Sequence, residues 1–144
     1  MSRAQWGVVA AAPFIMGLQA LRLRRLGYRE TLAKIPKTTG SSDNAASRLQ
    51  QAQETEYAVR LAMRAGPWRP RCLLRSLTLA WFLSRQGIAF HLRIGAPVKG
   101  TRMPDGLPPG FHAHAWVEHA GVVLNDRLDI AADYAPFAAP AADE

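Results

Sequence analysis

The sequence predicts an α+β fold, in which helices come first and a small antiparallel sheet follows. Three segments carry apolar side chains at helical spacing: residues 14–35, 48–65 and 68–87. After Gly87 the period of the apolar residues changes to two, a pattern that is typical of strands. Helices followed by strands, without regular alternation of the two, indicate helices packed on an antiparallel sheet.

The length and composition of the chain are those of one compact domain. The chain has 144 residues, of which 49% are apolar and 20% are charged. Such a chain can bury a single hydrophobic core. We expect residues 1–47 to form an N-terminal helical segment and linker, residues 48–130 the core, and residues 131–144 an Ala/Pro-rich tail.

The first helical segment, at 14–35, predicts one or two helices. Its apolar positions are Phe14, Leu18, Leu21, Leu26 and Leu32. Pro13 lies near the predicted start, Pro36 closes the run, and Gly27 is the expected break between two helices.

The apolar run WGVVAAAPFIMGLQAL, at residues 6–21, follows Arg3 and has the length of a signal-peptide core. It is shorter than the ~20 residues that span a bilayer, and no small-x-small cleavage site follows it. We therefore expect a bundle helix that buries an apolar stripe. The arginines at its end, Arg22, Arg24 and Arg25, also allow peripheral contact with a membrane.

A run of small and polar residues at 36–47 predicts a linker, and residues 48–65 predict a helix because they lack Pro and Gly. The expected apolar face of this helix consists of Leu49, Ala52, Tyr57, Leu61 and Met63. Glu56 and Arg60 lie four residues apart, in the order that favours an ion pair on a helix.

The helix predicted at 68–87 carries the only cysteine of the chain, Cys72. Pro70 suits a first helical turn, so Cys72 is expected within that turn, and Gly87 suits the position just past the helix end. Apolar side chains cover most of the circumference, so this helix is expected to be central and buried. One cysteine cannot form an internal disulfide, which favours a reducing compartment and a cytoplasmic location.

The second half of the chain predicts three strands and a long loop. Residues 89–98 alternate apolar with polar side chains and predict a strand. A loop rich in Pro and Gly follows at 99–110. The segments FHAHAWVE (111–118) and VVLNDR (122–127) predict two more strands, and Gly121 suits the last position of a three-residue hairpin loop between them.

Alternation places four side chains on one face of the first hairpin strand: His112, His114, Trp116 and Glu118. The pairs expected from a three-residue loop are Glu118–Val122, Trp116–Leu124 and His114–Asp126. Asp126 then lies close enough to His114 to orient its imidazole. A two-residue loop would place Asn125 opposite His114 instead, and an asparagine can do the same. His119 is expected in the loop, and Glu118 is expected to pair with a surface arginine.

Cys72 is the candidate nucleophile for this histidine. A helix N-terminus, a protonated imidazole and the nearby Arg69, Arg71 and Arg75 all favour the thiolate. A carboxylate beside His114 fixes its tautomer and favours its protonated form. These residues suit thiol acyl transfer, in which the cysteine attacks a carbonyl, the histidine moves the proton and the aspartate orients the histidine.

Three stretches, CLLRSLTLAWFLSRQGIAFHLRIGA, FHAHAWVE and VVLND, resemble the leader peptidases of lasso-peptide biosynthesis. These enzymes belong to the transglutaminase-like superfamily of papain-type cysteine proteases, and the resemblance covers residues 68–128. It implies a transglutaminase-like, papain-type core with a Cys–His–Asp triad. The implied nucleophile is Cys72, the implied base is His114, and Asp126 is implied to orient the base.

The resemblance also implies a function. Family members remove the leader from a ribosomally made precursor peptide and so free the N-terminus of the core peptide. The implied partners are a small leader-recognition protein and an ATP-dependent macrolactam cyclase, and no cofactor is implied. His112 and Trp116 share a strand face with His114 and are candidates for contact with the substrate.

Other functions fit the same residues. A transglutaminase-like thiol could pass its acyl group to an amine, and the basic helices could form a non-catalytic module that binds a partner of the pathway. Cys72, His112 and His114 could hold zinc, but no CxxC or second histidine pair completes such a site. Residues 1–75 have thirteen Lys and Arg against four Asp and Glu, a net charge of +9, without an RNA- or DNA-binding motif. We therefore expect neither a metal nor a nucleic-acid partner.

Overall fold

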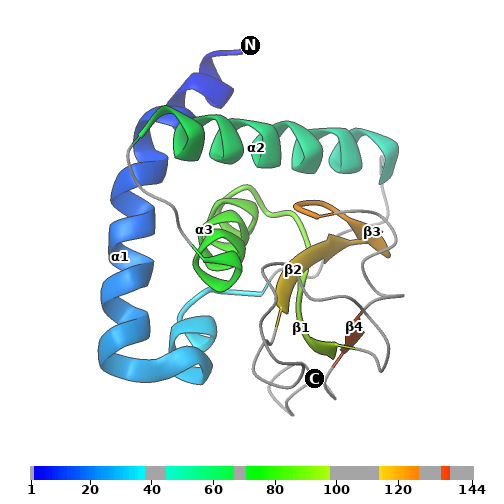
Figure 1. The fold of residues 1–144 in the computed structure, drawn as a ribbon. Coiled ribbons are helices and arrows are strands. Elements are labelled where there is room, and N and C mark those ends of the chain that lie inside the picture. Colours follow the sequence, from blue (N-terminus) through cyan, green and yellow to red (C-terminus); the bar gives the residue numbers. More distant parts are fainter. Residues whose placement is uncertain (1, 38–44, 67–70, 98–113, 127–133, 137–144) are drawn as a thin grey trace.

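The computed structural model describes residues 2–37, 45–66, 71–97, 114–126 and 134–136. Within these ranges the chain forms three helices followed by a four-stranded antiparallel sheet (Figure 1), so the predicted α+β class is confirmed. The helices are α1 (Arg3–Ala33), α2 (Ala45–Ala65) and α3 (Cys72–Arg85). The strands are β1 (His91–Pro97), β2 (His114–His119), β3 (Val122–Val123) and β4 (Tyr134–Pro136). The loop predicted at 99–110 lies outside the described residues.

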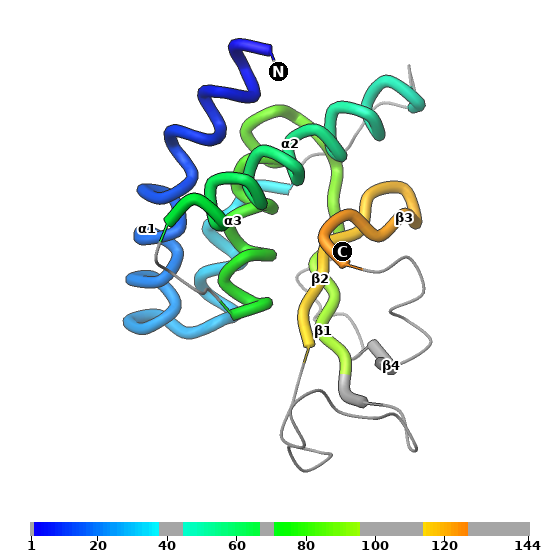
Figure 2. The backbone as a smooth tube through the Cα atoms, turned by 45° about the horizontal axis from the view of Figure 1, so that its top comes forward, coloured from blue at the N-terminus to red at the C-terminus, as the bar shows by residue number. Residues whose placement is uncertain are grey.

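Helix α3 is the central element. It lies between α1 and β2 and also packs against α2 (Figure 2). Its buried residues are Ser76, Leu77, Thr78, Leu79, Ala80, Phe82, Leu83 and Ser84. The buried hydroxyls have partners, since Thr78 Oγ1 donates to the Leu74 carbonyl (2.8 Å) and Ser84 Oγ donates to the Pro36 carbonyl (2.5 Å). The prediction of a central, buried helix is therefore confirmed.

Gly87 terminates α3, as the sequence predicts. Its φ is +72°, and its N–H donates to the Ser84 carbonyl (3.1 Å) while the Ile88 N–H donates to the Leu83 carbonyl (2.9 Å). These two bonds form a Schellman motif, which closes the helix. Arg48 of α2 donates to the Gly87 carbonyl (2.7 Å) and so ties this turn to the second helix.

Helix α1 begins at Arg3, so the predicted start near Pro13 is wrong. A capping box begins the helix: Ser2 Oγ accepts from the Gln5 N–H (3.2 Å), and Gln5 Oε1 accepts from the Ser2 N–H (2.6 Å). Packing on α2 and α3 maintains the helix through Pro13, although proline lacks the N–H that would continue the hydrogen-bond ladder. Gly27, with φ of +81°, interrupts the helix as predicted.

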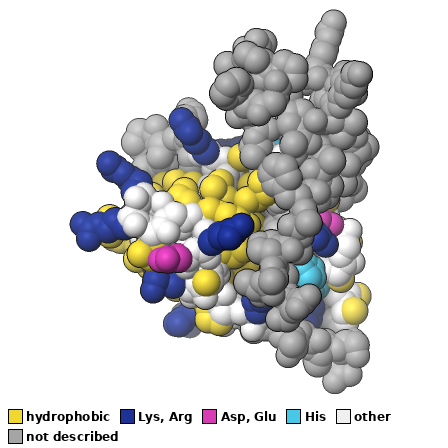
Figure 3. All heavy atoms as spheres, turned by 90° about the horizontal axis from the view of Figure 1, so that it is seen from below, with side chains coloured by type: hydrophobic (Ala, Val, Ile, Leu, Met, Phe, Trp, Pro, Cys, Tyr) yellow, Lys and Arg dark blue, Asp and Glu magenta, His cyan; other side chains and the backbone are white. Residues whose placement is uncertain are grey.

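Only five residues of α1 are buried: Val8, Ala12, Met16, Gln19 and Thr31. Other positions expose large apolar side chains, since Trp6 is 56% exposed, Phe14 79% and Leu21 49%. Seen from below, apolar surface lies among Lys and Arg side chains (Figure 3). By length and composition α1 could cross a membrane, a property shared with signal sequences and with core helices of soluble proteins. Peripheral membrane contact stays a prediction.

Helix α2 packs through a face rich in small residues: Ala52, Thr55, Ala58, Val59, Ala62 and Met63. Tyr57, which the sequence places on this face, is 48% exposed, and the Arg60 guanidinium lies 5.6 Å from its ring centre. The predicted position of Tyr57 is therefore wrong. The predicted pair of Glu56 and Arg60 is confirmed, with 3.6 Å between Oε1 and Nε.

The strands follow one another across the sheet in the order β3-β2-β1-β4. Strands β1 and β2 pair with Leu92 opposite Val117 and Ile94 opposite Ala115. Strand β4 pairs with the end of β1, although the sequence predicts an Ala/Pro-rich tail at 131–144. Residues 134–136 form a strand because β1 offers an unpaired edge, and a pairing between such distant segments leaves no local signal.

The β2–β3 hairpin differs in register from both predicted pairings. His119 pairs with Val122, so the loop contains only Ala120 and Gly121. Both residues have positive φ, +50° and +80°, as in a type I′ turn. The sequence predicts a longer loop because an alanine at positive φ is uncommon.

His119 consequently ends β2 and does not lie in the loop as predicted. Its side chain is buried, with 7% exposed. The ring donates from Nδ1 to the Ala89 carbonyl (2.6 Å). This bond to the segment before β1 holds the residue in the strand and leaves the turn to the two residues that follow.

Substitution of Gly87 tests whether the turn after α3 requires a glycine. In Gly87→Ala the new methyl group meets only Arg48 Nη1 at 4.0 Å, so the penalty comes from the left-handed backbone. We expect the free energy of unfolding, measured with urea, to fall by about 1–2 kcal/mol. The matched control is Gly17→Ala in α1, where nothing lies within 4 Å of the new Cβ. Because alanine suits a helix better than glycine, this substitution should raise the free energy of unfolding by about 0.5–1 kcal/mol. Equal effects of the two substitutions would contradict the assigned role of Gly87.

Candidate active site

Cys72 is the first residue of α3. Arg71 precedes it as the N-cap residue, with an extended backbone and no hydrogen bond from its side chain to the cap. The first N–H groups of a helix have no carbonyl partner within it, and their dipoles favour a negative charge nearby. The Cys72 side chain is half-buried at this position. The fold therefore places the thiol where the thiolate is stabilised.

Strand β2 packs against α3 beside Cys72. Ala115 is 3% exposed, and Val117 is fully buried in the core with Leu83. The small side chain of Ala115 lets the strand backbone come close to the helix. The backbone N–H of Ala115 and that of Leu73 both hydrogen-bond the Cys72 sulfur. The packing of a strand on a helix thus provides two donors to the thiolate.

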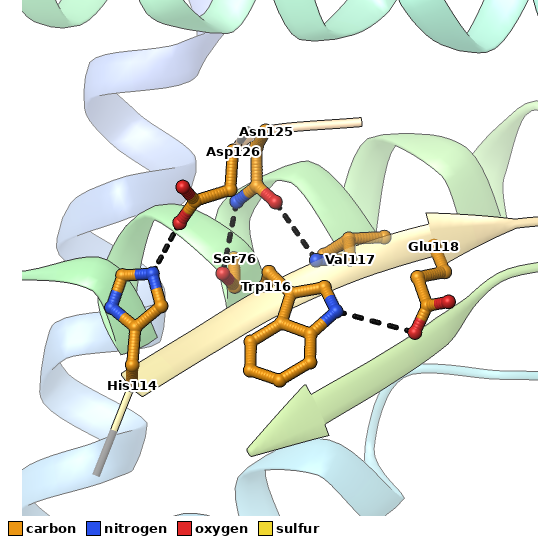
Figure 4. Close-up of polar contacts among 7 residues, drawn as sticks. All are labelled: Ser76, His114, Trp116, Val117, Glu118, Asn125 and Asp126. Atoms are coloured by element: carbon orange, nitrogen blue, oxygen red, sulfur yellow. Dashed lines mark hydrogen bonds and ion pairs between the residues drawn. The ribbon is translucent and has the colours of Figure 1, made fainter. Parts of the chain in front are cut away.

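His114 is the first residue of β2, and its ring points toward Asp126 (Figure 4). Its Nε2 hydrogen-bonds Asp126 Oδ2, and the contact is an ion pair when the ring is protonated. The ring also hydrogen-bonds Cys72. Because Asp126 occupies Nε2, we assign the bond with the thiol to Nδ1. The three residues predicted from the sequence form one hydrogen-bonded chain, Cys72–His114–Asp126.

Asp126 reaches His114 although the observed register does not pair the two residues. Strand β3 ends at Val123, and the Leu124 N–H still donates to the Val117 carbonyl (2.9 Å). After this bond the chain bends out of the strand. The bend, rather than the strand pairing, brings the carboxylate to the imidazole.

Asn125 holds this bend. Its Oδ1 accepts from the Val117 N–H (2.8 Å), and its Nδ2 donates to Ser76 Oγ (2.9 Å) on α3 (Figure 4). The amide thus replaces the backbone acceptor that a longer β3 would supply. The sequence suggests Asn125 only as an alternative partner of His114, and its role as a support depends on the buried Ser76, which no sequence pattern connects to it.

The electrostatics of the site favour a charged pair. Burial raises the pKa of the Cys72 thiol, but hydrogen bonds with His114, Ala115 and Leu73 and the charge of His114 outweigh it, so this pKa lies below its usual value. Hydrogen bonds with Asp126 and Cys72 raise the pKa of His114 to about 9, against the effect of burial. The site therefore holds a thiolate beside an imidazolium between these two pKa values.

Trp116 lies beside His114. The centroids of the two rings are 6.1 Å apart and the ring planes differ by 28°. Trp116 is fully buried, and its Nε1 donates to Glu118 Oε2 (3.2 Å), which also accepts from Arg93 Nε (3.0 Å). The predicted pairing of Glu118 with an arginine is confirmed. Contact of Trp116 with the substrate stays a prediction, and His112 lies outside the described residues.

The zinc site considered from the sequence gains no support. In the part of the chain that the structure describes, no group of three or more His, Cys, Asp or Glu side chains could hold a metal ion. His114 uses its ring nitrogens for Asp126 and Cys72. His112, the third residue of that site, lies outside the described residues, so the structure does not test the zinc site itself.

Comparison with known proteins adds one finding to this geometry. A family model described as the transglutaminase-like superfamily matches residues 15–139. No curated protein and no solved structure matches the chain significantly. The matched range contains Cys72, His114 and Asp126. Members of the superfamily are typically cysteine proteases or acyltransferases, and both chemistries need a reactive thiolate.

Removal of His114 should raise the pKa of Cys72, because a hydrogen bond and a positive charge are lost while burial remains. Alkylation by iodoacetamide follows the thiolate, so the pH midpoint of its rate measures this pKa. We expect the midpoint below the ordinary value of 9.0 in the wild type and at a higher pH in His114→Ala. His91→Ala, at an exposed position of β1, should leave it unchanged. An identical midpoint in His114→Ala and the wild type would exclude the assigned contact.

Loss of the Asn125 amide should destabilise the protein, because the Val117 N–H and the Ser76 hydroxyl both lose a partner. We expect Asn125→Ala to lower the free energy of unfolding by about 1–3 kcal/mol in urea. Gln50→Ala is the matched control, since it removes an exposed amide that donates to Glu54 (3.3 Å), and it should change the value by less than about 0.5 kcal/mol. Similar small effects of both substitutions would show that Asn125 does not hold the bend.

Proposed function

Since the chain belongs to the transglutaminase-like superfamily, we propose that it is a cysteine peptidase. The observation that carries this proposal is the hydrogen-bonded chain Cys72–His114–Asp126 at the start of a buried helix. A thiolate favoured by a helix N-terminus and by a protonated histidine is the reactive form of a catalytic cysteine. The carboxylate on the far nitrogen orients the ring and favours its charged form.

In the proposed reaction the Cys72 thiolate attacks the carbonyl carbon of a peptide bond and forms a tetrahedral intermediate. Protonated His114 transfers its proton to the leaving nitrogen, the C–N bond breaks, and a thioester and a free amine remain. His114 then takes a proton from water, whose oxygen attacks the thioester. Collapse releases the carboxylic acid and regenerates the thiolate beside protonated His114. Asp126 keeps the ring oriented throughout.

We further propose that the substrate is a ribosomally made precursor peptide, cut between leader and core before macrolactam closure. The resemblance of residues 68–128 to lasso-peptide leader peptidases supports this substrate class. The proposal includes a small leader-recognition protein and an ATP-dependent macrolactam cyclase as partners. It places the reaction in the cytoplasm, where the single cysteine stays reduced.

An acyltransferase is the second candidate, because the superfamily includes both activities. The same thioester would form on Cys72, and an amine instead of water would accept the acyl group. Mass spectrometry of the product separates a free acid from an amide. A non-catalytic binding module is the third candidate. It requires that the wild type bind a precursor without changing its mass.

Substitutions in the hydrogen-bonded chain test the peptidase proposal. Cys72→Ala should lower kcat for a synthetic precursor by roughly 10⁴-fold or more, because no nucleophile remains. Asp126→Asn should lower kcat by roughly 10²–10⁴-fold, since an amide does not favour the protonated ring. Liquid chromatography with mass spectrometry measures cleavage, and urea unfolding checks the fold.

Glu54→Gln is the matched control for Asp126→Asn, because it neutralises a carboxylate on α2 away from the site. It should leave kcat unchanged. Processing by Cys72→Ala at the wild-type rate would contradict the assigned nucleophile. A loss of stability in Asp126→Asn as large as its loss of activity would indicate a structural role for this carboxylate.

A further inference from the structure

A cavity of about 460 Å³ lies between α2, α3 and the segment after β3. Asp126 forms part of its wall, so the cavity adjoins the hydrogen-bonded chain of the active site. Its volume falls within the range of sites that hold small ligands or side chains, roughly 300–1,000 Å³. The proposed reaction uses Asp126 but leaves the cavity itself without a role.

Positive charge is in excess around the cavity. Three arginines line it: Arg60, Arg64 and Arg75. Two carboxylates also line it, but each has a cationic neighbour. Glu56 Oε1 lies 3.6 Å from Arg60 Nε, and Asp126 hydrogen-bonds His114. The wall therefore has three guanidinium groups against one carboxylate, Glu56, that His114 does not pair.

The cavity wall is exposed at Arg60 and Arg64 and partly buried at Glu56 and Arg75. Burial is the largest influence on the pKa of Glu56 and raises it, although Arg60, Arg75 and Arg64 act in the opposite direction. Several of the remaining wall residues are apolar: Val59, Met63, Leu79 and Leu124. At the partly buried Arg75 a charge-assisted hydrogen bond is stronger than at an exposed surface.

Arg75, which lines this wall, has an unsatisfied donor beneath it. Its Nε is buried and has no hydrogen-bond partner among the described residues. Arg75 lies three residues after Cys72 on α3, so the backbone positions of the two residues are about one helical turn apart. A buried N–H without an acceptor is unfavourable, and rotation of the Arg75 guanidinium toward an acceptor in the cavity would remove this penalty.

We propose that the cavity binds the carboxylate of an acidic side chain in the peptide substrate. Arg75 and Arg64 hold the carboxylate, and the methylene groups of the side chain contact the apolar wall formed by Met63 and Leu79. This inference rests on the proposed function, since it assumes a peptide at the site. It gives the enzyme a preference for Asp or Glu near the cleaved bond.

A positional peptide library tests the preference. Synthetic fluorogenic octapeptides carry Glu, Gln, Lys or Leu in turn at each position on either side of the cleaved bond. We expect the wild type to prefer Glu to Gln at one position by about tenfold in kcat/KM, because the amide is isosteric but uncharged. Equal rates for Glu and Gln at every position, or a preference for Lys, would overturn the proposal.

Substitutions separate binding from a structural effect. Arg75→Gln should bring the Glu-to-Gln ratio close to one, and Arg75→Lys should restore part of it. Arg85→Gln, in the last turn of the same helix and outside the cavity, is the matched control and should keep the wild-type ratio. A merely structural role of Arg75 would lower kcat/KM for all peptides alike and leave the ratio unchanged, which would overturn the proposal.

Binding to the inactive chain distinguishes this proposal from the peptidase proposal. Fluorescence anisotropy with Cys72→Ala should show tighter binding of Glu peptides than of Gln peptides, without any need for cleavage. If the wild type cleaves no peptide but this difference persists, the cavity assignment stands and the peptidase assignment fails. If the wild type cleaves without a preference for Glu, the peptidase assignment stands and the cavity assignment fails.

Discussion

The contact between the first turns of α3 and strand β2 is the interaction on which the rest of the structure depends. Ala115, 3% exposed, lets the strand backbone donate to the Cys72 sulfur, and one turn further along the helix Ser76 binds Asn125 (2.9 Å). A larger side chain at position 115 would separate thiol from imidazole. Burial of α3 by α1 and α2 fixes the helix against which this contact forms. The position of the Cys72 thiol is therefore a consequence of core packing.

The contact between Asp126 and His114 depends on the short length of β3. In the observed register a longer β3 would place residue 127 opposite His114 and residue 126 opposite Ala115. The Asp126 side chain would then share the face of Ala115, which packs on α3, and could not meet His114. The chain must therefore leave the strand after two residues. The Asn125 amide stabilises this bend, because its Oδ1 accepts a hydrogen bond from the Val117 N–H (2.8 Å), which would otherwise have no partner on β3.

Patterns within short stretches of the sequence predict most of the helices and strands and the residues of the candidate site. They do not predict the long-range contacts that bring these residues together. The Gly87 stop and the apolar circumference of α3 are local signals, and the structure confirms both. The contact between His114 and Asp126 is predicted correctly, but the predicted hairpin register is wrong. Ala120 adopts a positive φ, and the loop is therefore shorter than predicted. Contacts between residues far apart in the sequence determine the other features of the fold and the site. Neither the pairing of β4 with β1 nor the bond between Ser76 and Asn125 has a signal within its own segment.

Asp126 has more influence on the charge state of the site than the thiol has. Its hydrogen bond is the largest cause of the raised pKa of His114, about 9, ahead of the bond with Cys72. Because this pKa exceeds the ordinary value of 6.5, protonation of His114 stabilises the fold below about pH 6.5, and that contribution is lost as the pH rises through about 9. At neutral pH the imidazole is therefore protonated while it is hydrogen-bonded to Asp126. The charge on His114 in turn contributes to the lowered pKa of the Cys72 thiol, so the Asp126 carboxylate acts on the thiol through the imidazole ring.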